Sequence, residues 1–344
     1  FYQYFNLVMS NLRKILINKN LCKSVWFMRQ AGRYLPEFRK IRKKNQNFIN
    51  LCLNSDLSSE ITLQPIKRFN LDSAIIFSDI LLVPYALGQS VKFNKKPGPK
   101  LSDFNSKILF SNNEKKFSQK LGSVYKAIEI TRNKLNKNKS LICFVGAPWT
   151  LIVYMLGLKK NKAEINLDKL NSNSILLNDI INELIKYLCI HIKNQINAGA
   201  DVVQIFDSWA GLIPKKDINK YCYEPNTKIV EFCNLKKIPN ICFPKGLNKD
   251  FEEFNKIVKP DGINIDHDIE PSWAKDKLKD VVIQGGLNPR ILLKSKDKMF
   301  QAATKYFETF KDIPYIFNLG HGLLPETDPD KVDELIKFYR NFNE

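Results

Sequence analysis

Short runs of apolar and β-branched residues recur along the chain, separated by longer stretches in which apolar residues return at helical spacing. Apolar runs without polar alternation are typical of strands buried on both faces, as in a parallel sheet. The pattern predicts eight strands, at Ser24–Met28, Ser73–Phe77, Leu141–Val145, Asp201–Phe206, Asn240–Phe243, Gly262–Ile265, Val281–Gln284 and Tyr315–Asn318.

The amphipathic stretches between these runs predict helices. One is expected to begin at Asp56 or Ser58 and to end at Phe69, and another to run from Asn178 to Asn197, where Ala198-Gly199 closes it. Further helices are predicted at Lys116–Leu135, Lys216–Cys233, Asp297–Phe310 and Pro329–Phe342, and an excursion at Lys92–Ser111.

Eight strands that alternate with helices predict an α/β fold, a (β/α)₈ TIM barrel, rather than an open doubly wound sheet. No glycine-rich dinucleotide turn follows the first run, and no Pro/Gly/Ser-rich linker divides the chain. We therefore expect a single domain over residues 9–344. The chain begins at Phe1, and Met9 is expected to be the true start, with residues 1–8 a non-native or disordered extension.

Charge and cysteine content limit the kinds of partner and compartment that we expect for this protein. The formal net charge is +19, but its lysines are scattered along the chain rather than gathered in a tail or on one face, so we expect no nucleic-acid partner. The seven cysteines form no C-x-x-C pair, which favours a reduced, cytoplasmic compartment over a disulfide framework or a zinc site. No apolar run approaches the ~20 residues of a membrane span.

Four of the nine arginines lie within residues 25–42, although the chain otherwise uses lysine for positive charge. A guanidinium is a planar fork of donors that matches a carboxylate or a phosphate. Arg29 and Arg33 are expected to flank the turn at the exit of the first strand. The spacing alone fits an anion site and a surface loop with paired arginines equally well.

Other polar residues also follow predicted strands, and in a barrel the chemistry lies at those ends. Asp79 is either a helix N-cap or a carboxylate aimed at ligand N–H groups or positive charge. His321, between two glycines that let the backbone approach a ligand closely, is expected either to bond a ligand or to hold its own turn.

Tyr154 is expected on the opening turns of a helix, where a phenol is more often packing than chemistry. Ser208 lacks the G-x-S-x-G elbow of a hydrolase, so a hydrogen-bonding role is expected rather than a nucleophilic one. The chain carries no P-loop, no H-E-x-x-H and no metal-ligand spacing. These residues predict a site without metal or organic cofactor for a carboxylate-rich ligand, and they leave the reaction open.

Five segments resemble the uroporphyrinogen decarboxylase family, in the right order and at predicted strand ends. They are Arg29-Gln-Ala-Gly-Arg-Tyr-Leu-Pro-Glu-Phe, Ile75-Ile-Phe-Ser-Asp-Ile-Leu, Gly146-Ala-Pro-Trp-Thr-Leu, Phe206-Asp-Ser-Trp-Ala-Gly and Asn318-Leu-Gly-His-Gly-Leu-Leu-Pro. The resemblance implies a homodimeric barrel that removes CO₂ from the four acetate arms of uroporphyrinogen III, giving coproporphyrinogen III in haem and chlorophyll biosynthesis, without metal or cofactor.

The resemblance also implies which residues form the site. Asp79, Arg29 and Tyr154 are the expected catalytic residues, and the expected substrate-binding residues are these three with Gln30, Arg33, Ser208 and His321. Asp79 would accept the pyrrole N–H groups and balance a ring cation, and the arginines would bind carboxylate arms. The residue that delivers the proton stays open.

The chain departs from the family pattern in two places. Asn288 stands where Asp is expected, and Asp266-His267 replaces an acid-plus-tryptophan pair; both departures are expected to lie away from the catalytic set. Two alternative hypotheses are that the protein is a corrinoid-dependent methyltransferase of the same superfamily, or that it is a non-catalytic tetrapyrrole-binding protein. The first would need His-x-Cys, which none of the three histidines provides.

Overall fold

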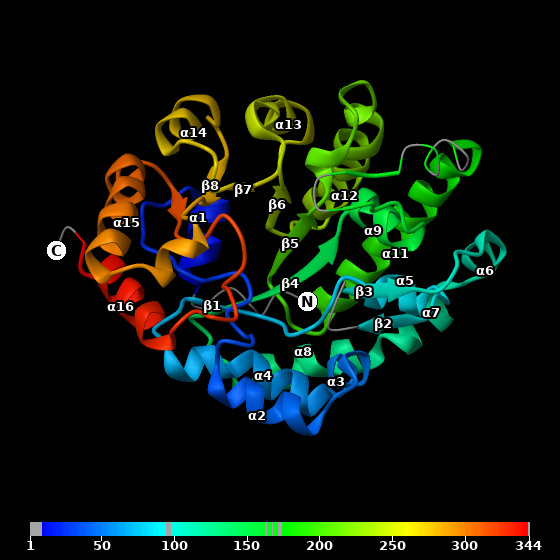
Figure 1. Cartoon of the computed structure of the whole chain (residues 1–344), viewed down its shortest axis with the longest axis horizontal. Coiled ribbons are helices and arrows are strands. Elements are labelled where there is room, and N and C mark those ends of the chain that lie inside the picture. Colours follow the sequence, from blue (N-terminus) through cyan, green and yellow to red (C-terminus); the bar gives the residue numbers. More distant parts are fainter. Residues whose placement is uncertain are drawn as a thin grey trace, which may run out of the picture.

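Seven parallel strands pair side by side in one sheet that curls around a common centre, with helices arranged outside it (Figure 1). The structure is a computed structural model that describes residues 9–93, 98–161, 164–166, 168, 170 and 174–342; the expectation about residues 1–8 lies outside them. The strands, in the order in which they pair, are β1 Ser73–Ile75, β4 Ser140–Gly146, β5 Val202–Asp207, β6 Asn240–Pro244, β7 Gly262–Ile265, β8 Val282–Gly285 and β9 Tyr315–Ile316.

The helices between these strands return the chain to the same end of the sheet, which is why all the pairs are parallel. The α-helices that the structure describes are α1 Asn11–Asn18, α2 Pro36–Lys44, α3 Phe48–Cys52, α4 Ser55–Arg68, α5 Leu82–Ala86, α6 Ser106–Phe110, α7 Glu114–Lys120, α8 Gly122–Lys134, α9 Pro148–Met155, α11 Ser174–Asn197, α12 Glu224–Leu235, α13 Phe251–Val258, α14 Pro271–Lys277, α15 Lys296–Phe310 and α16 Pro329–Arg340. Short turns of 3₁₀-helix add η1 Ala210–Leu212, η2 Lys215–Asp217, η4 Asn248–Asp250 and η5 Pro289–Leu293, and η3 Asn219–Tyr223 is a π-helix.

The segment predicted as the first strand, Ser24–Met28, lies between the two ends of the curled sheet. Its Val25 forms one parallel bridge with Phe317, just after β9. On the other side, the Val25 carbonyl accepts the Asp72 N–H at 3.0 Å, and the Val25 N–H donates to Asp72 Oδ2 at 2.7 Å. Because this pairing is limited to one bridge, the sheet has seven strands where eight were predicted.

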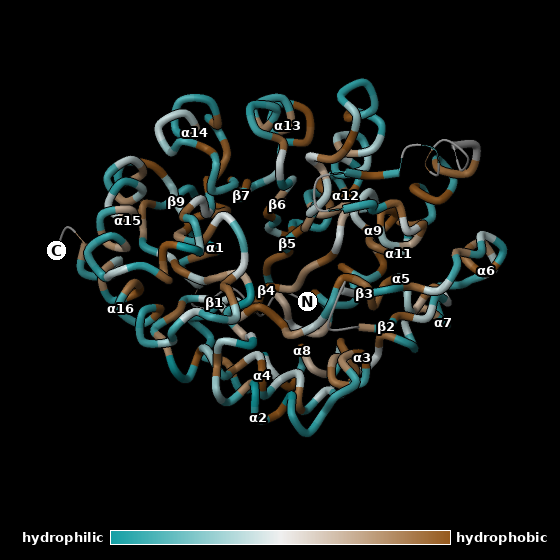
Figure 2. Tube along the Cα trace, viewed as in Figure 1, coloured by the Kyte–Doolittle hydropathy of each residue, from teal (hydrophilic) through white to brown (hydrophobic). Residues whose placement is uncertain are grey.

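Two hydrophobic clusters follow from alternation along the strands. An inner cluster includes Trp26, Ile75 and Phe243, and Leu12 and Leu16 of α1 belong to it. A larger outer cluster fills the space between the sheet and the helices. In Figure 2, hydrophobic residues are frequent in the strands near the centre, and hydrophilic residues are frequent in the outer loops and helices. The helix α1 therefore packs against the inner side of the sheet.

Four fully buried polar side chains form a hydrogen-bonded layer inside the curled sheet, which we call the amide layer: Trp26, Gln204, Asn264 and Gln284. Trp26 Nε1 donates to Gln284 Oε1 at 2.9 Å, and Gln284 Nε2 donates to Gln204 Oε1 at 3.1 Å and to Asn264 Oδ1 at 2.9 Å. The other two amide nitrogens donate to the carbonyls of Ile241 and Ile265. Each neutral group in this layer has a partner, as burial requires.

The predicted helix boundaries need three corrections. Asn54, rather than Asp56 or Ser58, caps α4, because its side chain accepts the Leu57 N–H at 3.0 Å. The helix predicted at Lys116–Leu135 is two helices, α7 and α8, which meet at Leu121, immediately before a glycine that favours a break. The helix predicted at Lys216–Cys233 begins as η2 and η3 before α12 continues it.

The excursion at Lys92–Ser111 contains a two-stranded antiparallel ribbon, β2 Val91–Phe93 and β3 Pro99–Leu101, followed by α6. Its residues 94–97 lie outside the described part of the chain. This ribbon is separate from the main sheet.

Candidate active site

The predicted site residues gather at the carboxyl end of the curled sheet, which we call the mouth. Arg29 follows the Ser24–Met28 segment, Asp79 follows β1, Ser208 follows β5, and His321 follows β9. Tyr154 comes from α9, after β4, on its last turn rather than on the opening turns that were expected. The strand-end rule therefore brings these five side chains to one edge of the sheet.

Arg29 occupies a backbone conformation that is unusual for a residue other than glycine, with φ +61°. The turn is held by the Gln30 N–H, which donates to the Phe27 carbonyl at 3.0 Å. The Arg29 side chain crosses Gly322 so closely that a Cβ added to that glycine would come within 2.6 Å of Arg29 Cγ. A side chain at position 322 would therefore displace Arg29 from this position.

Arg29 is exposed to solvent at the mouth. Burial and the nearby charge of Arg33 both lower the pKa of Arg29, while Tyr154 and Asp79 raise it. Two neighbouring guanidinium groups repel each other, so an anion between them would be favoured.

Gln30 points into the protein. It is fully buried; its Oε1 accepts the Phe27 N–H at 3.0 Å, and its Nε2 donates to the Ser73 carbonyl at 3.0 Å. Both ends of the amide are thus used by the backbone, behind Arg29 and next to β1. This placement does not fit the expected contact between Gln30 and a substrate.

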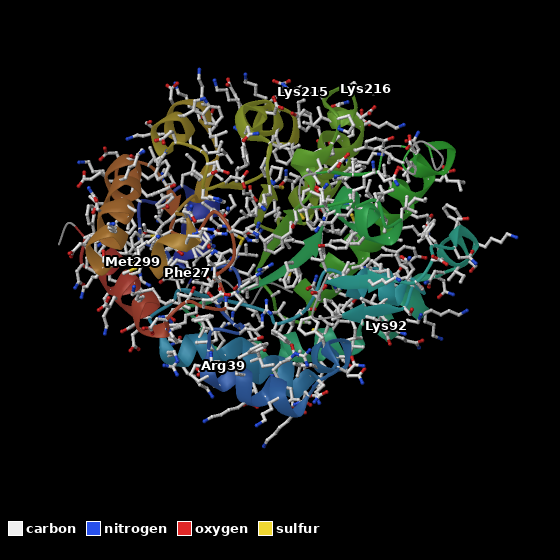
Figure 3. All side chains as sticks on the ribbon, viewed as in Figure 1. Phe27, Arg39, Lys92, Lys215, Lys216 and Met299 are labelled. Carbon is white, nitrogen blue, oxygen red and sulfur yellow. The ribbon has the colours of Figure 1, made fainter. Side chains whose placement is uncertain are left out.

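The four arginines of residues 25–42 divide into two pairs. Arg33 is exposed, and none of its side-chain nitrogens makes a hydrogen bond or ion pair with the described residues. Arg39 donates to the carbonyls of Arg33 and Tyr34, and Arg42 donates to the Asn45 carbonyl. Figure 3 shows Arg39 on α2, in the outer ring of helices. Only Arg29 and Arg33 are therefore available at the mouth.

Asp79 is half-buried at the end of β1. Its Oδ1 accepts the Leu81 N–H at 2.8 Å, so it braces the turn before α5, although Leu81 is the N-cap of that helix. Burial raises the pKa of Asp79 to about 6, against the opposing effects of this hydrogen bond and of Arg29. The second carboxylate oxygen makes no hydrogen bond to the described residues and is free for a ligand.

The end of β1 is rigid because α4 holds it. Ser58 donates to the Phe77 carbonyl at 2.6 Å, and the Phe77 N–H donates to Thr62 Oγ1 at 2.8 Å. The position of Asp79, two residues later, is thereby fixed relative to the sheet.

Tyr154 and Ser208 belong to the wall between β4 and β5. The Tyr154 ring meets Trp209 edge to face, with ring centroids 6.1 Å apart, and burial raises the pKa of the phenol. Ser208 lies in a turn held by Thr150, whose hydroxyl donates to Asp207 Oδ1 at 2.7 Å and accepts the Trp209 N–H at 3.3 Å. Trp209 therefore packs on Tyr154, and Thr150 fixes the turn that carries Ser208.

His321 is neutral in this environment. Burial lowers its pKa to about 3, and the charges of Lys245, Arg29 and His267 act in the same direction. Its Nδ1 accepts the Gly322 N–H at 2.6 Å, which places the ring proton on Nε2. The sequence left open whether His321 holds its own turn or binds a ligand. Its Nδ1 holds the turn, and its Nε2 remains available for a ligand.

Three residues of the mouth were not included in the predicted site: Lys245 after β6, and Asp266 and His267 after β7. Their charges act on His321 or on each other, so the Asp266-His267 departure lies beside the expected catalytic set and not away from it. Asn288, the other departure, caps η5 by accepting the Arg290 N–H at 2.9 Å. The signal that could have found the three was the same strand-end position that identified Asp79.

A surface hollow of about 460 Å³ lies apart from the mouth, lined by Gly88, Ile108, Lys116 and Lys120 among others. It contains none of the residues at the ends of the main strands. The chemistry described above therefore assigns the site to the mouth and not to this hollow.

Two further features of the described residues concern membranes and metal ions. None of the helices in the described ranges is long and apolar enough to cross a membrane. Within the same ranges, no three His, Cys, Asp or Glu side chains gather in a way that would hold a metal ion.

Comparison with known proteins adds independent evidence. The model of a family described as uroporphyrinogen decarboxylase (URO-D) matches residues 22–342. Uroporphyrinogen decarboxylase of Orientia tsutsugamushi (strain Boryong) is 41% identical over 330 residues, covering 95% of this chain and 96% of that protein. The enzyme of the same name from Rickettsia felis is 40% identical over 323 residues, covering 93% of both. A solved methyltransferase from Methanosarcina mazei has a similar fold, with a TM-score of 0.78 at 15% identity over 97% of this chain and 98% of the other.

Proposed function

The chain belongs to the uroporphyrinogen decarboxylase family, a family of carboxy-lyases of porphyrin biosynthesis, and from that premise we propose how its mouth performs the reaction. The substrate is uroporphyrinogen III, and removal of its four acetate carboxyl groups gives coproporphyrinogen III. The observation that carries the assignment is the meeting of two arginines with one half-buried carboxylate at the mouth.

Loss of CO₂ from a pyrrole acetate needs an acceptor for two electrons. A proton added to the pyrrole ring makes the ring cationic; the bond between the arm methylene and its carboxylate then breaks, and its electron pair enters the ring as CO₂ leaves. A second proton adds to the exocyclic carbon, and the ring loses its extra proton, so a methyl group remains. The substrate itself thus supplies the electron acceptor that a cofactor would otherwise provide.

Asp79 stabilises the cationic ring. Its free oxygen accepts pyrrole N–H groups, and its negative charge balances the positive charge that develops during protonation. This role requires the ionised form, which still predominates at neutral pH although burial raises the pKa of Asp79 to about 6.

The donors around Asp79 hold the carboxylate arms. Arg29 and Arg33 bind arms through their guanidinium groups, His321 donates from Nε2, and Tyr154 and Ser208 donate from their hydroxyl groups. Gln30 is a positioning residue: by fixing the turn to Ser73 it holds the strained backbone of Arg29 in place.

Three finer features belong to the same proposal. The Ser24–Met28 segment serves as the eighth strand and completes a (β/α)₈ barrel, which its contacts with Asp72 and Phe317 support. The enzyme is a homodimer in the cytoplasm. Sedimentation velocity at micromolar concentration tests the dimer, for which a monomeric mass would be the contrary result.

An anaerobic turnover assay tests the function. Purified protein with chemically reduced uroporphyrinogen III should release coproporphyrinogen III, identified after oxidation by chromatography of the porphyrins. A non-catalytic carrier would bind the substrate and return it unchanged. A corrinoid-dependent methyltransferase would need a methyl donor and would leave the carboxyl groups in place, so loss of CO₂ separates all three.

A further inference from the structure

Lys245, Asp266 and His267 have no role in the mechanism above, yet they lie at the mouth. The Ser24–Met28 segment sits between β9 and β1, and β6 is the fourth strand from it in either direction around the sheet. Lys245 is the residue immediately after β6, and Asp266 and His267 follow β7. The strand end that carries Lys245 is therefore the one farthest around the sheet from Arg29.

The loop that carries Lys245 is held firmly. The Lys245 N–H donates to the Asp207 carbonyl at 3.0 Å, and its carbonyl accepts the Gly211 N–H at 2.9 Å. A Cβ added to Gly211 would lie 2.8 Å from Gly246 Cα, so this loop packs directly on the turn that contains Ser208. The half-buried Lys245 ammonium makes no ion pair with the described residues.

Asp266 fixes the same loop from the other side and leaves one polar atom unsatisfied. It is only 4% exposed, its Oδ2 accepts the Gly246 N–H at 2.6 Å, and its Oδ1 is buried without a partner among the described residues. Buried polar atoms in native proteins nearly always have a partner, from the protein, from water or from a ligand.

His267 brings a second unsatisfied atom to the same place. Its Nδ1 is buried without a partner in the described part of the chain, and its Nε2 lies 3.7 Å from Asp268 Oδ1. The backbone of His267 packs on Gly320, where an added Cβ would lie 2.8 Å from His267 Cα. The imidazole therefore adjoins the turn of His321.

We propose that Lys245 and His267 form a second carboxylate-binding site, which holds an acetate or propionate arm of the substrate at the ends of β6 and β7. The proposal rests on the proposed function, because a ring with eight carboxylates around its edge presents more arms than Arg29 and Arg33 can bind. An unpaired ammonium and an imidazole N–H supply further donors, and Asp266 positions the loop that carries the ammonium.

Steady-state kinetics of Lys245→Met and His267→Phe test the site. We expect KM for uroporphyrinogen III to rise roughly tenfold in the first and about threefold in the second, as for loss of one charged and one weaker hydrogen bond, with kcat less affected. Lys245→Arg should restore a KM close to that of the wild type. Lys249→Met, at an exposed lysine of the same loop, is the matched control and should leave KM unchanged.

The outcomes separate the two proposals. Wild-type protein that fails to decarboxylate would contradict the proposed function. Active wild type with an unchanged KM in Lys245→Met, or an equal rise in Lys249→Met, would overturn only the second site. If Lys245→Met does not fold by circular dichroism, Lys245→Gln removes the charge at similar size and is judged by the same criterion.

Discussion

The amide layer and the mouth are both polar, and both lie along the axis of the curled sheet, yet they treat hydrogen bonding in opposite ways. In the amide layer, neutral side chains satisfy one another completely. At the mouth, Asp79 keeps a free oxygen, and Asp266 and His267 keep buried atoms without partners. Neutral groups whose hydrogen bonds are all made within the protein stabilise one specific fold, whereas polar groups that keep a free hydrogen-bonding atom are available to a ligand. The comparison predicts that substitutions in the two regions will separate stability from activity.

Asp79→Asn should show the largest effect on activity. The amide keeps the acceptor for the Leu81 N–H but loses the negative charge that stabilises the ring cation, so kcat should fall roughly 10²- to 10³-fold, as for loss of one preorganised electrostatic group. The free energy of unfolding should not fall, because burial disfavours this charge, as its raised pKa indicates, and asparagine removes it. Turnover and urea denaturation measured on the same preparation check both; a near-normal kcat would remove Asp79 from the mechanism.

Gln284→Leu should lower the stability of the protein and leave its activity nearly unchanged. It leaves Trp26 Nε1, Gln204 Oε1 and Asn264 Oδ1 without their shared partner. We expect the free energy of unfolding to fall by about 3 kcal/mol, since each buried unsatisfied group costs about 1 kcal/mol or more. The kcat of the protein that remains folded should stay close to that of the wild type. A loss of kcat without a loss of stability would contradict the division between the two regions.

The pH dependence of kcat/KM should be intermediate in size. Asp79 must be ionised, and its pKa of about 6 leaves roughly a tenth of the carboxylate ionised at pH 5. The value of kcat/KM should therefore fall about tenfold between pH 7 and pH 5, with a midpoint near 6. His321, with its pKa lowered to about 3, stays neutral throughout this window.

Stability does not explain such a loss of activity. Because the pKa of Asp79 is raised in the folded state, the folded protein binds this proton more tightly than the unfolded chain, so the contribution of Asp79 favours folding at low pH and is lost as pH rises from about 4 to 6. Burial also raises the pKa of Asp266 to about 6, so Asp266→Asn is the control. An unchanged midpoint in that variant excludes Asp266 as the titrating group and is the expected result, and disappearance of the midpoint would assign the titration to Asp266.

The sequence predicted the part of the fold that depends on local pattern. Continuous apolar runs located all seven strands of the main sheet, because strands buried on both faces need no polar alternation. The Ser24–Met28 segment was different, since its pairing depends on how the two ends of the sheet meet, and 291 residues of chain lie between Val25 and Phe317. The start of α4 offered several polar residues in a row, and local pattern does not choose among them.

The site residues, like the strands, divide into those that the sequence pattern predicted and those that depend on the folded structure. The strand-end rule located Arg29, Asp79, Ser208 and His321, because a curled parallel sheet brings the carboxyl ends of its strands together. The direction in which Gln30 points depends on the left-handed backbone of Arg29, which no residue type announces in the sequence, because the conformation is ordinarily reserved for glycine. Lys245 also follows a strand, but it was not singled out because the chain has many lysines and this position alone does not distinguish one of them.

Arg33→Lys should give the smallest measurable effect, and its comparison with Arg39→Lys is the sharpest. Lysine keeps the charge at the mouth but loses the planar fork, so kcat/KM for uroporphyrinogen III should fall about fivefold, roughly 1 kcal/mol. Arg39 lies six residues away, carries the same charge and bonds only backbone carbonyls, so Arg39→Lys should leave kcat/KM unchanged. An equal fall in both variants would indicate that net positive charge, rather than a specific guanidinium, attracts the octa-anionic substrate. Kinetics at low and high salt distinguish these cases, because long-range attraction is screened while a bidentate contact is not.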